Sequence, residues 1–378
     1  MNHGLIIYGG ESVEHEISII SALQAYKNYQ DDKYSFELVY LSKDKNFYVG
    51  EKLKELKNYQ NLFKLIKSCH KITFKKNKIN NYYQIGLKKH YFDFVWLIVH
   101  GQNCEDGSLY SYFNMKNIIC IAQDQYVGAL CQDKLMAKQY LKSFQVKQIP
   151  FTYAFLHEYN ESSNNILNRI EKIGFPVIIK PSHLGSSVGI QVAKNYEELI
   201  DAMELCFKFD QVIIIEKYLE NKQEFNISLL GANNDYKVSL IEEVTNKNIL
   251  TYDDKYKSNN SKGMASLSRI VPAKIEKKLE QKIQNVALKI ANVLNCSLLV
   301  RLDFIYDVNN KELYFNEINS IPGSLAFYLW ENELSFTDLI NSLINLGLQL
   351  EYSKKYLITT YQENVFADKK FSSLKLSK

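Results

Sequence analysis

Short apolar runs alternate with amphipathic stretches over the first hundred residues of the chain. Residues 5–8, 36–41 and 92–99 are runs of the kind that form buried strands, whereas Ile17 and Ile20 lie three residues apart among polar neighbours, as on one face of a helix. The order strand, helix, strand is typical of a βαβ unit. The pattern therefore predicts an open α/β sheet for the N-terminal part.

Further elements are predicted beyond residue 130. Two runs rich in Leu, Phe, Ile and Tyr flank Asn309-Asn310, which is a β-hairpin signal over 301–319. The stretch 274–294 carries its apolar residues on one stripe and predicts an amphipathic helix. The other predicted elements are a helix at 133–143 and strands at 177–181, at 211–215 and from 224 onward.

Three stretches have no clear hydrophobic period. The Lys/Asn-rich segment 43–90 is interpreted as insertion and loops with one helix near 52–67. Residues 251–268 are polar and aperiodic, and a loop of that length is typical of a functional lid. The Lys/Ser-rich end of the chain after 350 is predicted to be a mobile tail from Ala367 onward.

The composition of the 378 residues indicates a soluble globular protein of two or three domains, with 46% hydrophobic and 23% charged residues. The net charge of +4 comes from basic residues spread along the chain, which argues against a dedicated nucleic-acid binder. No apolar run is long enough to cross a membrane, and no secretory signal is visible. The six cysteines are scattered without metal-site spacing, so we expect free thiols in a reducing cytoplasm.

The predicted hairpin carries the most concentrated candidate chemistry. Side chains alternate along a strand, so Arg301 and Asp303 share one face, and Glu317 and Asn319 share one face of the partner strand. Folding about the turn brings Asp303 opposite Asn316 or Glu317. Hard oxygen ligands of this kind suit Mg²⁺ bound together with substrate phosphates. The alternative is a solvated hairpin with its polar residues outward.

Two strand ends in the N-terminal part place polar residues where ligands bind in open α/β sheets. Gly9-Gly10 form a tight turn before a helix, a geometry that presents backbone N–H groups to an anion. Glu14 lies at the start of that helix, where capping is an equally good interpretation. His100 and Glu105 follow the strand at 92–99.

A second group of phosphate-binding signals lies in the middle of the chain. Lys180 ends an apolar strand and is followed by the small-residue loop 182–189, which can cradle phosphates with N–H groups, hydroxyls and one ammonium. The loop differs from the common P-loop pattern, and the alternative is a flexible turn. Lys134 lies in the first turn of the helix at 133–143 with Asp133 as its N-cap. Glu216 ends the strand at 211–215, an edge that can hold a purine and ribose.

Taken in order along residues 4 to 345, these motifs resemble those of the D-alanine–D-alanine ligases, which have the ATP-grasp fold. Each motif is weak alone, and the full set in family order is specific. The motifs are Gly9-Gly10 through Ser18, His100-Gly101 with Glu105 to Gly107, Lys180-Pro181 with Gly185 to Gly189, Glu216-Lys217, Lys255-Tyr256, Arg301 with Asp303, Glu317 with Asn319, and Pro322-Gly323.

The resemblance implies an N-terminal open βαβ domain followed by a two-lobed ATP-grasp part of α+β character. It implies four segments, namely an N-terminal domain at 1–128, a central lobe at 129–220, a C-terminal lobe at 221–348 with the lid 251–268, and an extension at 349–378. It also implies that ATP phosphorylates the carboxylate of one D-alanine and that the amine of a second attacks the acyl phosphate, for peptidoglycan precursor synthesis. Two Mg²⁺ ions, replaceable by Mn²⁺, a homodimer and a cytoplasmic location are further implications.

The resemblance also assigns roles to residues. The metal ligands are Asp303, Glu317 and Asn319. The ATP-binding residues are Lys134, Lys180, Ser186, Ser187, Glu216, Lys217, Tyr218, Leu219, Glu224, Lys255 and Asn316. The catalytic group is Glu14, Ser186, Tyr256, Arg301, Gly323 and Ser324, and the substrate-binding group is Glu14, His100, Lys255, Arg301, Gly323 and Ser324.

Second-substrate preference stays open at this level, whereas the residues argue against three rival functions. Tyr256 favours an amine over D-lactate as nucleophile, while D-serine is not excluded because one hydroxyl is a small difference for a pocket. Another ATP-grasp carboxylate–amine ligase would not need Glu14, Ser186 and Tyr256 together. A nucleotide-binding regulatory protein would have lost its metal ligands or Arg301. A dehydrogenase would need a Gly-x-Gly-x-x-Gly turn, which Gly9-Gly10 lacks.

Overall fold

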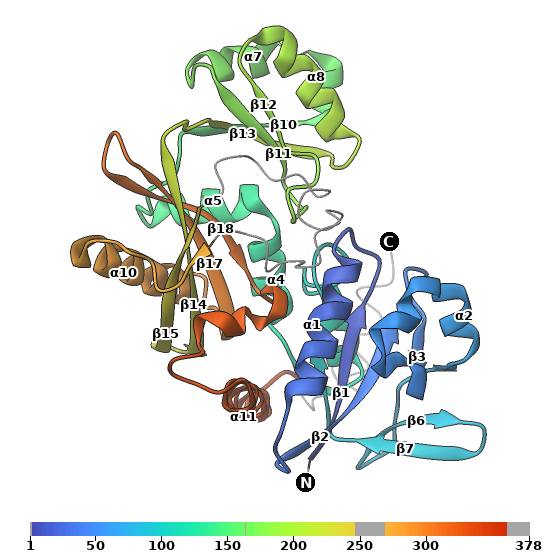
Figure 1. Ribbon diagram of the computed structural model, residues 1–378. Coiled ribbons are helices and arrows are strands. Elements are labelled where there is room, and N and C mark those ends of the chain that lie inside the picture. Colours follow the sequence, from blue (N-terminus) through green and yellow to red (C-terminus); the bar gives the residue numbers. More distant parts are fainter. Residues whose placement is uncertain (1, 163, 246–268, 361–378) are drawn as a thin grey trace, which may run out of the picture.

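The computed structural model describes residues 2–162, 164–245 and 269–360. The sheets and helices form three regions. In Figure 1 the blue N-terminal region lies beside the orange and red C-terminal region, and the green central region lies above both. The predicted class, α/β with an α+β second part, is confirmed. The segment limits at 128, 220 and 348 stay a prediction.

The N-terminal region is a six-stranded sheet in the order β4-β3-β2-β1-β8-β9. Strand β1 pairs in parallel with β2 and β8, and β8 pairs in parallel with β9, so the predicted open α/β sheet is confirmed. Strands β3 and β4 extend it in antiparallel pairing. The helix after β1 is α1 (His15–Asn28). The strand bounds are β1 Asn2–Gly9, β2 Tyr34–Leu41, β3 Phe47–Val49, β4 His70–Ile72, β8 Phe94–Leu97 and β9 Ile119–Ile121.

The segment 43–90 is more ordered than its pattern predicts. The single helix expected near 52–67 is wrong, because that stretch folds as two 3-10 turns and the short helix α2 (Leu62–Lys67). The loops expected elsewhere include the hairpin β6–β7, which turns at Gly86 with a φ of 57°. The alternation of apolar and polar residues along its strands is weak, yet Tyr83 is buried and donates a hydrogen bond to Glu37 (2.6 Å). The bounds are η1 Glu51–Lys54, η2 Leu56–Asn61, β5 Lys75–Lys76, β6 Asn81–Ile85 and β7 Lys88–Phe92.

The central region is an antiparallel sheet in the order β10-β13-β11-β12, with α7 and α8 packed on it (Figure 1). The predicted strand at 177–181 is β11, and the predicted strand at 211–215 is β13. Two helices precede this region, α3 Ser108–Met115 in the core of the N-terminal sheet and α4 Gln125–Gln132 in the core of the C-terminal sheet. The bounds that follow are α5 Lys134–Ser143, β10 Phe151–Phe155, α6 Leu156–Glu161, α7 Asn164–Glu171, β11 Val177–Pro181, β12 Gln191–Ala193, α8 Tyr196–Phe207 and β13 Val212–Lys217.

The C-terminal region is an antiparallel sheet in the order β16-β15-β14-β17-β18. The amphipathic helix predicted at 274–294 is α10, whose buried residues Ile283, Ala287 and Ile290 recur at helical spacing in a core shared with this sheet. The predicted hairpin is β17–β18, with Asp303 opposite Glu317, so the expected register is confirmed. The bounds are β14 Lys222–Ala232, β15 Asp235–Val244, β16 Arg269–Ile270, α10 Lys277–Val293, β17 Leu298–Asp307, β18 Glu312–Asn319 and η4 Gly323–Leu329.

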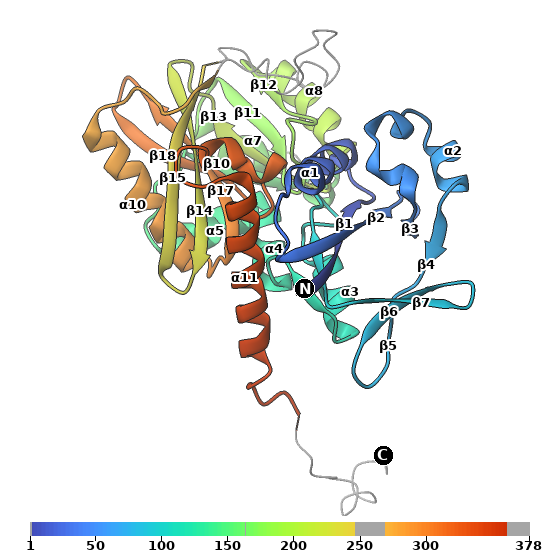
Figure 2. The same cartoon turned by 60° about the horizontal axis from the view of Figure 1, so that its bottom comes forward.

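The last described helix, α11 (Phe336–Lys354), packs against the N-terminal region, and Glu351 and Lys354 near its C-terminal end contact Tyr110 on α3 (Figure 2). Leu339, Ile340 and Leu343 are buried with residues of α1 and β1 in one core. The helix therefore continues past residue 350, where the sequence predicts the beginning of a polar tail. The predicted mobile end from Ala367 lies outside the described residues.

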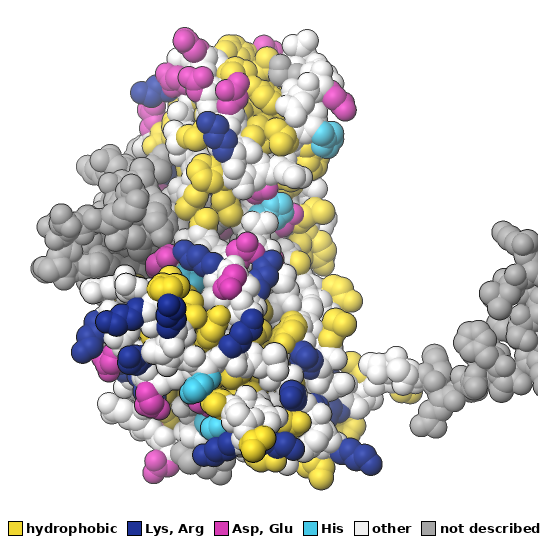
Figure 3. Space-filling view, turned by 90° about the vertical axis from the view of Figure 1, so that its right-hand side faces the viewer, with side chains coloured by type: hydrophobic (Ala, Val, Ile, Leu, Met, Phe, Trp, Pro, Cys, Tyr) yellow, Lys and Arg dark blue, Asp and Glu magenta, His cyan; other side chains and the backbone are white. Residues whose placement is uncertain are grey.

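The surface and the cysteines agree with the composition. On the face shown in Figure 3, lysines and arginines are most frequent over the lower part and are interspersed with other side chains, while acidic side chains gather at the top. All six cysteines are free thiols, as predicted. Within the described ranges, no helix combines the length and apolar character that crossing a bilayer requires.

Candidate active site

A row of polar side chains crosses the C-terminal sheet. Glu242 on β15 is opposite Asn226 on β14, which is opposite Asp303 on β17, which in turn is opposite Glu317 on β18. Directly opposed residues share a face of a sheet, so the row forms one polar stripe. Sequence analysis missed Asn226 and Glu242. The spacing of Asn226 two residues after Glu224 was an available signal.

Arg301 and Asp303 form a bidentate ion pair. The Nε and Nη2 groups of Arg301 donate to the two carboxylate oxygens of Asp303, both at 2.8 Å, and Asn319 donates to Asp303 at 3.3 Å. Burial raises the pKa of the Asp303 carboxyl above its usual value, although Arg301 acts in the opposite direction. The predicted polar cluster therefore exists, and the solvated-hairpin alternative is excluded because Arg301 and Asp303 are largely buried.

The donor set of this hairpin fits a hard divalent cation. Asp303, Glu317 and Asn319 offer two carboxylates and one amide oxygen from paired strands. Over the described part of the chain, no group of three His, Cys, Asp or Glu side chains could hold a metal ion, so a site here depends on the asparagine. The Lys134 ammonium lies 3.5 Å from Glu317, which places a cation of the chain beside the candidate site.

A buried lysine–glutamate–lysine group lies next to the hairpin. Glu216 forms ion pairs with Lys180 at 2.5 Å and with Lys138 at 2.7 Å, and Lys180 also donates a hydrogen bond to Asn316 at 3.1 Å. Burial raises the pKa of Glu216, but the two ammonium groups outweigh it and lower the pKa to about 2. Lys138 was missed by sequence analysis, although it lies one helical turn after Lys134 on α5.

Removing the Lys138 ammonium leaves Glu216 buried with a single cation. We expect Lys138→Met to lower the free energy of unfolding by about 3–5 kcal/mol, because a half-paired buried charge is costly. Urea unfolding followed by circular dichroism measures this, with Lys142→Met on the exposed side of the same helix as the matched control. Equal stability of the two variants would contradict the role of Lys138.

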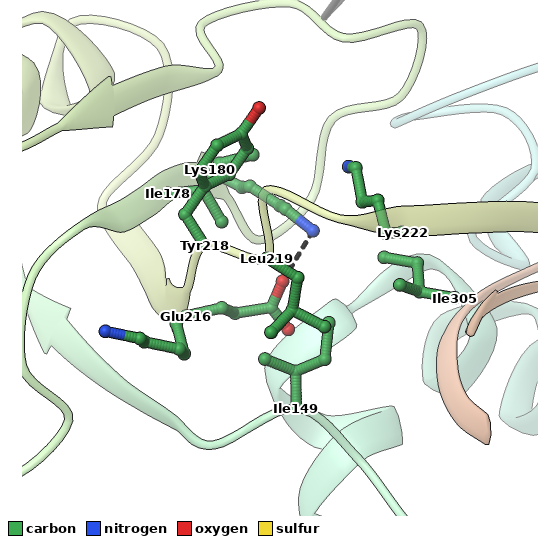
Figure 4. A pocket seen from close by; sticks show the side chains of 9 residues that line it. Ile149, Ile178, Lys180, Glu216, Tyr218, Leu219, Lys222 and Ile305 are labelled. Atoms are coloured by element: carbon green, nitrogen blue, oxygen red, sulfur yellow. Dashed lines mark ion pairs between the residues drawn. The ribbon is translucent and has the colours of Figure 1, made fainter. Parts of the chain in front are cut away.

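A cleft opens beside this ion pair, between β11, β13 and β17 (Figure 4). Side chains of Ile178 and Tyr218 lie on one side of it, and Ile149, Leu219 and Ile305 lie on another. The lining also includes the Lys180–Glu216 pair and the lysines Lys217 and Lys222, and apolar walls with a few charged groups suit a ring joined to an anionic group.

Two of the predicted nucleotide-binding residues near the cleft, Lys217 and Glu224, make contacts within the protein. The Lys217 ammonium donates to the carbonyls of Gly174 and Phe175 (3.2 and 2.7 Å), so it stabilises the turn before β11. Glu224 pairs with Lys222 at 2.8 Å beside the cleft. Contacts of Glu216, Lys217, Tyr218, Leu219 and Glu224 with a nucleotide stay a prediction.

Glu14 contacts the small-residue loop across 172 positions of sequence. Ser186 donates to the Glu14 carboxylate at 2.5 Å, and although Glu14 is the N-cap residue of α1, its side chain makes no capping bond. A Cβ at Gly185 would lie 2.6 Å from a Glu14 oxygen, so only glycine permits this approach. Ser186 and Ser187 both have positive φ, at 54° and 60°.

The turn 320–324 is held by buried side chains of the N-terminal region. Glu105 accepts from the Ser320 hydroxyl (2.8 Å) and the Ile321 amide (2.7 Å), and burial raises its pKa to about 7. His100 hydrogen-bonds Ser21 (3.1 Å) and the Ile321 backbone, and burial lowers its pKa to about 4, so the ring is neutral at pH 7. These bonds fix the backbone that follows the hairpin.

Ser324 follows Gly323 in an unusual conformation. Its amide donates to the Ser21 hydroxyl at 2.9 Å, and it begins a left-handed turn in which Ser324, Leu325 and Ala326 all have φ near 50°. Such backbone is costly for residues with a Cβ and persists where surrounding packing enforces it, often at functional sites. The predicted contacts of His100, Gly323 and Ser324 with a substrate stay predictions.

Comparison with known families decides what this arrangement belongs to. The model for the D-Ala–D-Ala ligase N-terminus matches residues 3–128, and the model for the C-terminus of the same family matches residues 140–345. The chain belongs to the D-alanine–D-alanine ligase family. The resemblance seen in the motifs is thereby confirmed.

Individual members of the D-alanine–D-alanine ligase family can be aligned with nearly the whole chain. A D-alanine–D-alanine ligase of Thermosipho melanesiensis is 35% identical, with 93% of this chain and 94% of the relative covered. The solved VanG D-Ala:D-Ser ligase of Enterococcus faecalis is 26% identical with a TM-score of 0.76, covering 92% of this chain and 99% of that one. The ligase of Coxiella burnetii, at 22% identity and a TM-score of 0.80, covers 94% and 96% and shows the shared fold.

Two ligase-family residues cannot be placed. Lys255 and Tyr256, with the predicted lid 251–268, lie outside the described residues. Besides the residues of the cleft and of the turn 320–324, the predicted site residues form two groups. Glu14 and Ser186 meet at the small-residue loop, and Lys134, Lys180 and Asn316 surround the hairpin with its candidate metal ligands.

Proposed function

We propose that this chain joins two D-alanines to D-alanyl-D-alanine at the expense of ATP, through a D-alanyl phosphate, for peptidoglycan precursor synthesis. The observation that carries the proposal is the Ser186–Glu14 bond of 2.5 Å. The bond places the Glu14 carboxylate, which can hold a substrate ammonium, against the loop that follows Lys180. An amino-acid site is thereby joined to a phosphate site.

The first step positions one D-alanine and ATP. Glu14 holds the ammonium of the first D-alanine, with Ser186 fixing the carboxylate's orientation. Lys134 and Lys180 neutralise phosphate oxygens as the γ-phosphoryl group moves to the substrate carboxylate. Asp303, Glu317 and Asn319 would hold Mg²⁺, which would supply further neutralisation of phosphate charge.

The second step forms the peptide bond. The amine of a second D-alanine attacks the acyl phosphate carbonyl, a tetrahedral oxyanion forms, and phosphate leaves. The Arg301 guanidinium and the Gly323 amide stabilise that oxyanion. Arg301 donates two nitrogens to Asp303, which holds the guanidinium in a fixed orientation. Ser324 binds the carboxylate of the second D-alanine from its left-handed turn.

A D-alanine–D-serine ligase is the alternative. Its support is the likeness to the VanG D-Ala:D-Ser ligase over 92% of this chain. The two activities differ only in one hydroxyl on the second substrate, which a pocket distinguishes weakly unless it bonds that hydroxyl. A homodimer and a cytoplasmic location are part of the proposal and rest on the family resemblance.

Phosphate release from ATP and Mg²⁺ tests the function, with D-alanine, L-alanine, D-serine and D-lactate offered singly and in pairs. We expect release to require D-alanine and to yield a dipeptide, and chelation by EDTA to stop it. Faster release with D-alanine plus D-serine than with D-alanine alone would favour the alternative. No phosphate release with any D-amino acid would contradict both the D-alanine–D-alanine and the D-alanine–D-serine activity.

A further inference from the structure

His183 bridges two aspartates at the beginning of the small-residue loop. Its Nδ1 lies 3.0 Å from the Asp210 carboxylate, and its Nε2 lies 3.2 Å from the Asp133 carboxylate. The proposed mechanism uses none of these three residues. An imidazole between two carboxylates is bound on both ring nitrogens, which requires both to donate and therefore favours the protonated ring.

The two aspartates belong to different segments of the chain. Asp133 is the N-cap of α5, accepting from the amides of Leu135 and Met136 at 2.9 and 3.1 Å. Asp210 precedes β13 and accepts from the amides of His183 and Val212. The imidazole therefore ties the start of α5 to the start of β13.

The same joint positions Lys134. The Lys134 amide donates to the Ser182 carbonyl (3.1 Å), and the Ser182 hydroxyl donates to Asp133 (2.7 Å). The Lys134 ammonium donates to the Leu184 carbonyl at 2.6 Å. Both ends of Lys134 are thus bound to the loop segment on either side of His183. A shift of this segment would move the ammonium relative to the hairpin.

The charges around the joint agree with a protonated ring. Hydrogen bonds to Asp133 and Asp210 raise the pKa of His183 to about 10, against the opposing effect of burial. The Asp133 carboxyl is buried, but its bonds to His183, Ser182 and Met136 lower its pKa to about 2. The joint is therefore an imidazolium between two carboxylates over the physiological pH range.

We propose that His183 is a positioning residue, which holds Lys134 and the root of the loop 182–189 in the geometry that binds the phosphates of ATP. This proposal rests on the proposed function only for the identity of the nucleotide, ATP. We expect a substitution at His183 to lower the ATP affinity more than the D-alanine affinity, because Lys134 is bonded to the loop root beside His183, whereas Ser186, which contacts Glu14, lies three residues further along the loop.

The test compares His183→Ala, His183→Arg and His157→Ala in the full chain. His157 lies in the same region, stacks on Phe155 and makes no part of the joint, so its variant is the matched control. We expect His183→Ala to raise the Kd for ATP, measured by calorimetry, and the KM for ATP by about tenfold or more, with the KM for D-alanine changed less than threefold. His183→Arg keeps a cation with several donors and should recover most of the affinity.

The outcomes separate a positioning role from a purely structural one. A lowered melting temperature of His183→Ala with unchanged ATP affinity would overturn the proposal, as would failure of His183→Arg to recover any affinity in a folded protein. If His183→Ala does not fold, Asp210→Asn loosens the same joint while keeping side-chain size, and it must show the same selective loss. ATP calorimetry needs no ligase turnover, so the result stands even if the D-alanine activity is absent.

Discussion

Glu317→Gln is expected to lower kcat by about 10³-fold while the protein stays folded. Glu317 is directly opposite Asp303 on the hairpin and 3.5 Å from the Lys134 ammonium. Its exchange removes one of two carboxylates that can hold a divalent cation against the ATP phosphates, where charge compensation is worth about 10²–10³ in rate. Its side chain is 31% exposed, so the loss leaves no deeply buried charge unpaired.

The matched control for this prediction is Glu312→Gln. Glu312 begins the same strand and pairs with Lys147 at 2.8 Å on the surface, away from the polar row. Steady-state kcat at saturating ATP and D-alanine, together with a melting curve, compares the two variants. Normal turnover of Glu317→Gln over a range of Mg²⁺ concentrations would contradict the metal assignment.

Glu14→Gln is expected to lower kcat/KM for D-alanine by about 10²–10³-fold with little change in ATP affinity. The glutamine keeps the size that the Gly185 approach requires, but it removes the negative charge that would pair with the substrate ammonium. Loss of one member of a desolvated charge pair costs about 2–5 kcal/mol. Glu16→Gln, two residues further along α1 and paired with Lys43 on the surface, is the control.

A double-mutant cycle separates the Glu14 and Ser186 contributions. Ser186→Ala removes the 2.5 Å bond to the Glu14 carboxylate, so its effect should be largely absent in the Glu14→Gln background. Strictly additive effects on kcat/KM for D-alanine would mean that the two residues act separately. An unchanged kcat/KM in Glu14→Gln alone would remove the amino-acid site from this position.

Local pattern was sufficient where the structure depends on local rules. The hairpin register could be predicted because side chains alternate with period two and Asn309-Asn310 mark the turn. The helix start at Asp133 could be predicted because an N-cap aspartate has a distinct position, and its side chain accepts from two amides as expected.

Long-range contacts could not be predicted in the same way. The Glu14–Ser186 bond joins residues 172 positions apart, and only the family resemblance suggested it. Lys138 looks like a solvent-facing helix residue, and its burial appears only once α5 packs against Glu216 on β13. His183 lies in the predicted phosphate-cradling loop, and its own contacts appear only once Asp133 and Asp210 are placed on either side of it.

Two other features of the structure lack a clear signal in the local sequence. The outer face of the β6–β7 hairpin carries Tyr82, Gln84, Lys89 and Tyr91, so the alternation of apolar and polar residues that marks a strand is weak, although Tyr83 is buried on the other face. The turn after Gly323 is left-handed at residues that ordinarily avoid that conformation, and no local signal predicts this. Tertiary contacts with Ser21 on α1 hold it in place.

Transfer of oxygen between substrate and phosphate tests the central claim most directly. D-Alanine labelled with ¹⁸O in its carboxylate is incubated with the enzyme, ATP and Mg²⁺, and the released phosphate is examined by mass spectrometry. Carboxylate attack on the γ-phosphoryl group carries one labelled oxygen into each phosphate, so we predict one ¹⁸O per phosphate alongside D-alanyl-D-alanine. Unlabelled phosphate would mean that ATP is hydrolysed by water and would contradict the acyl-phosphate mechanism.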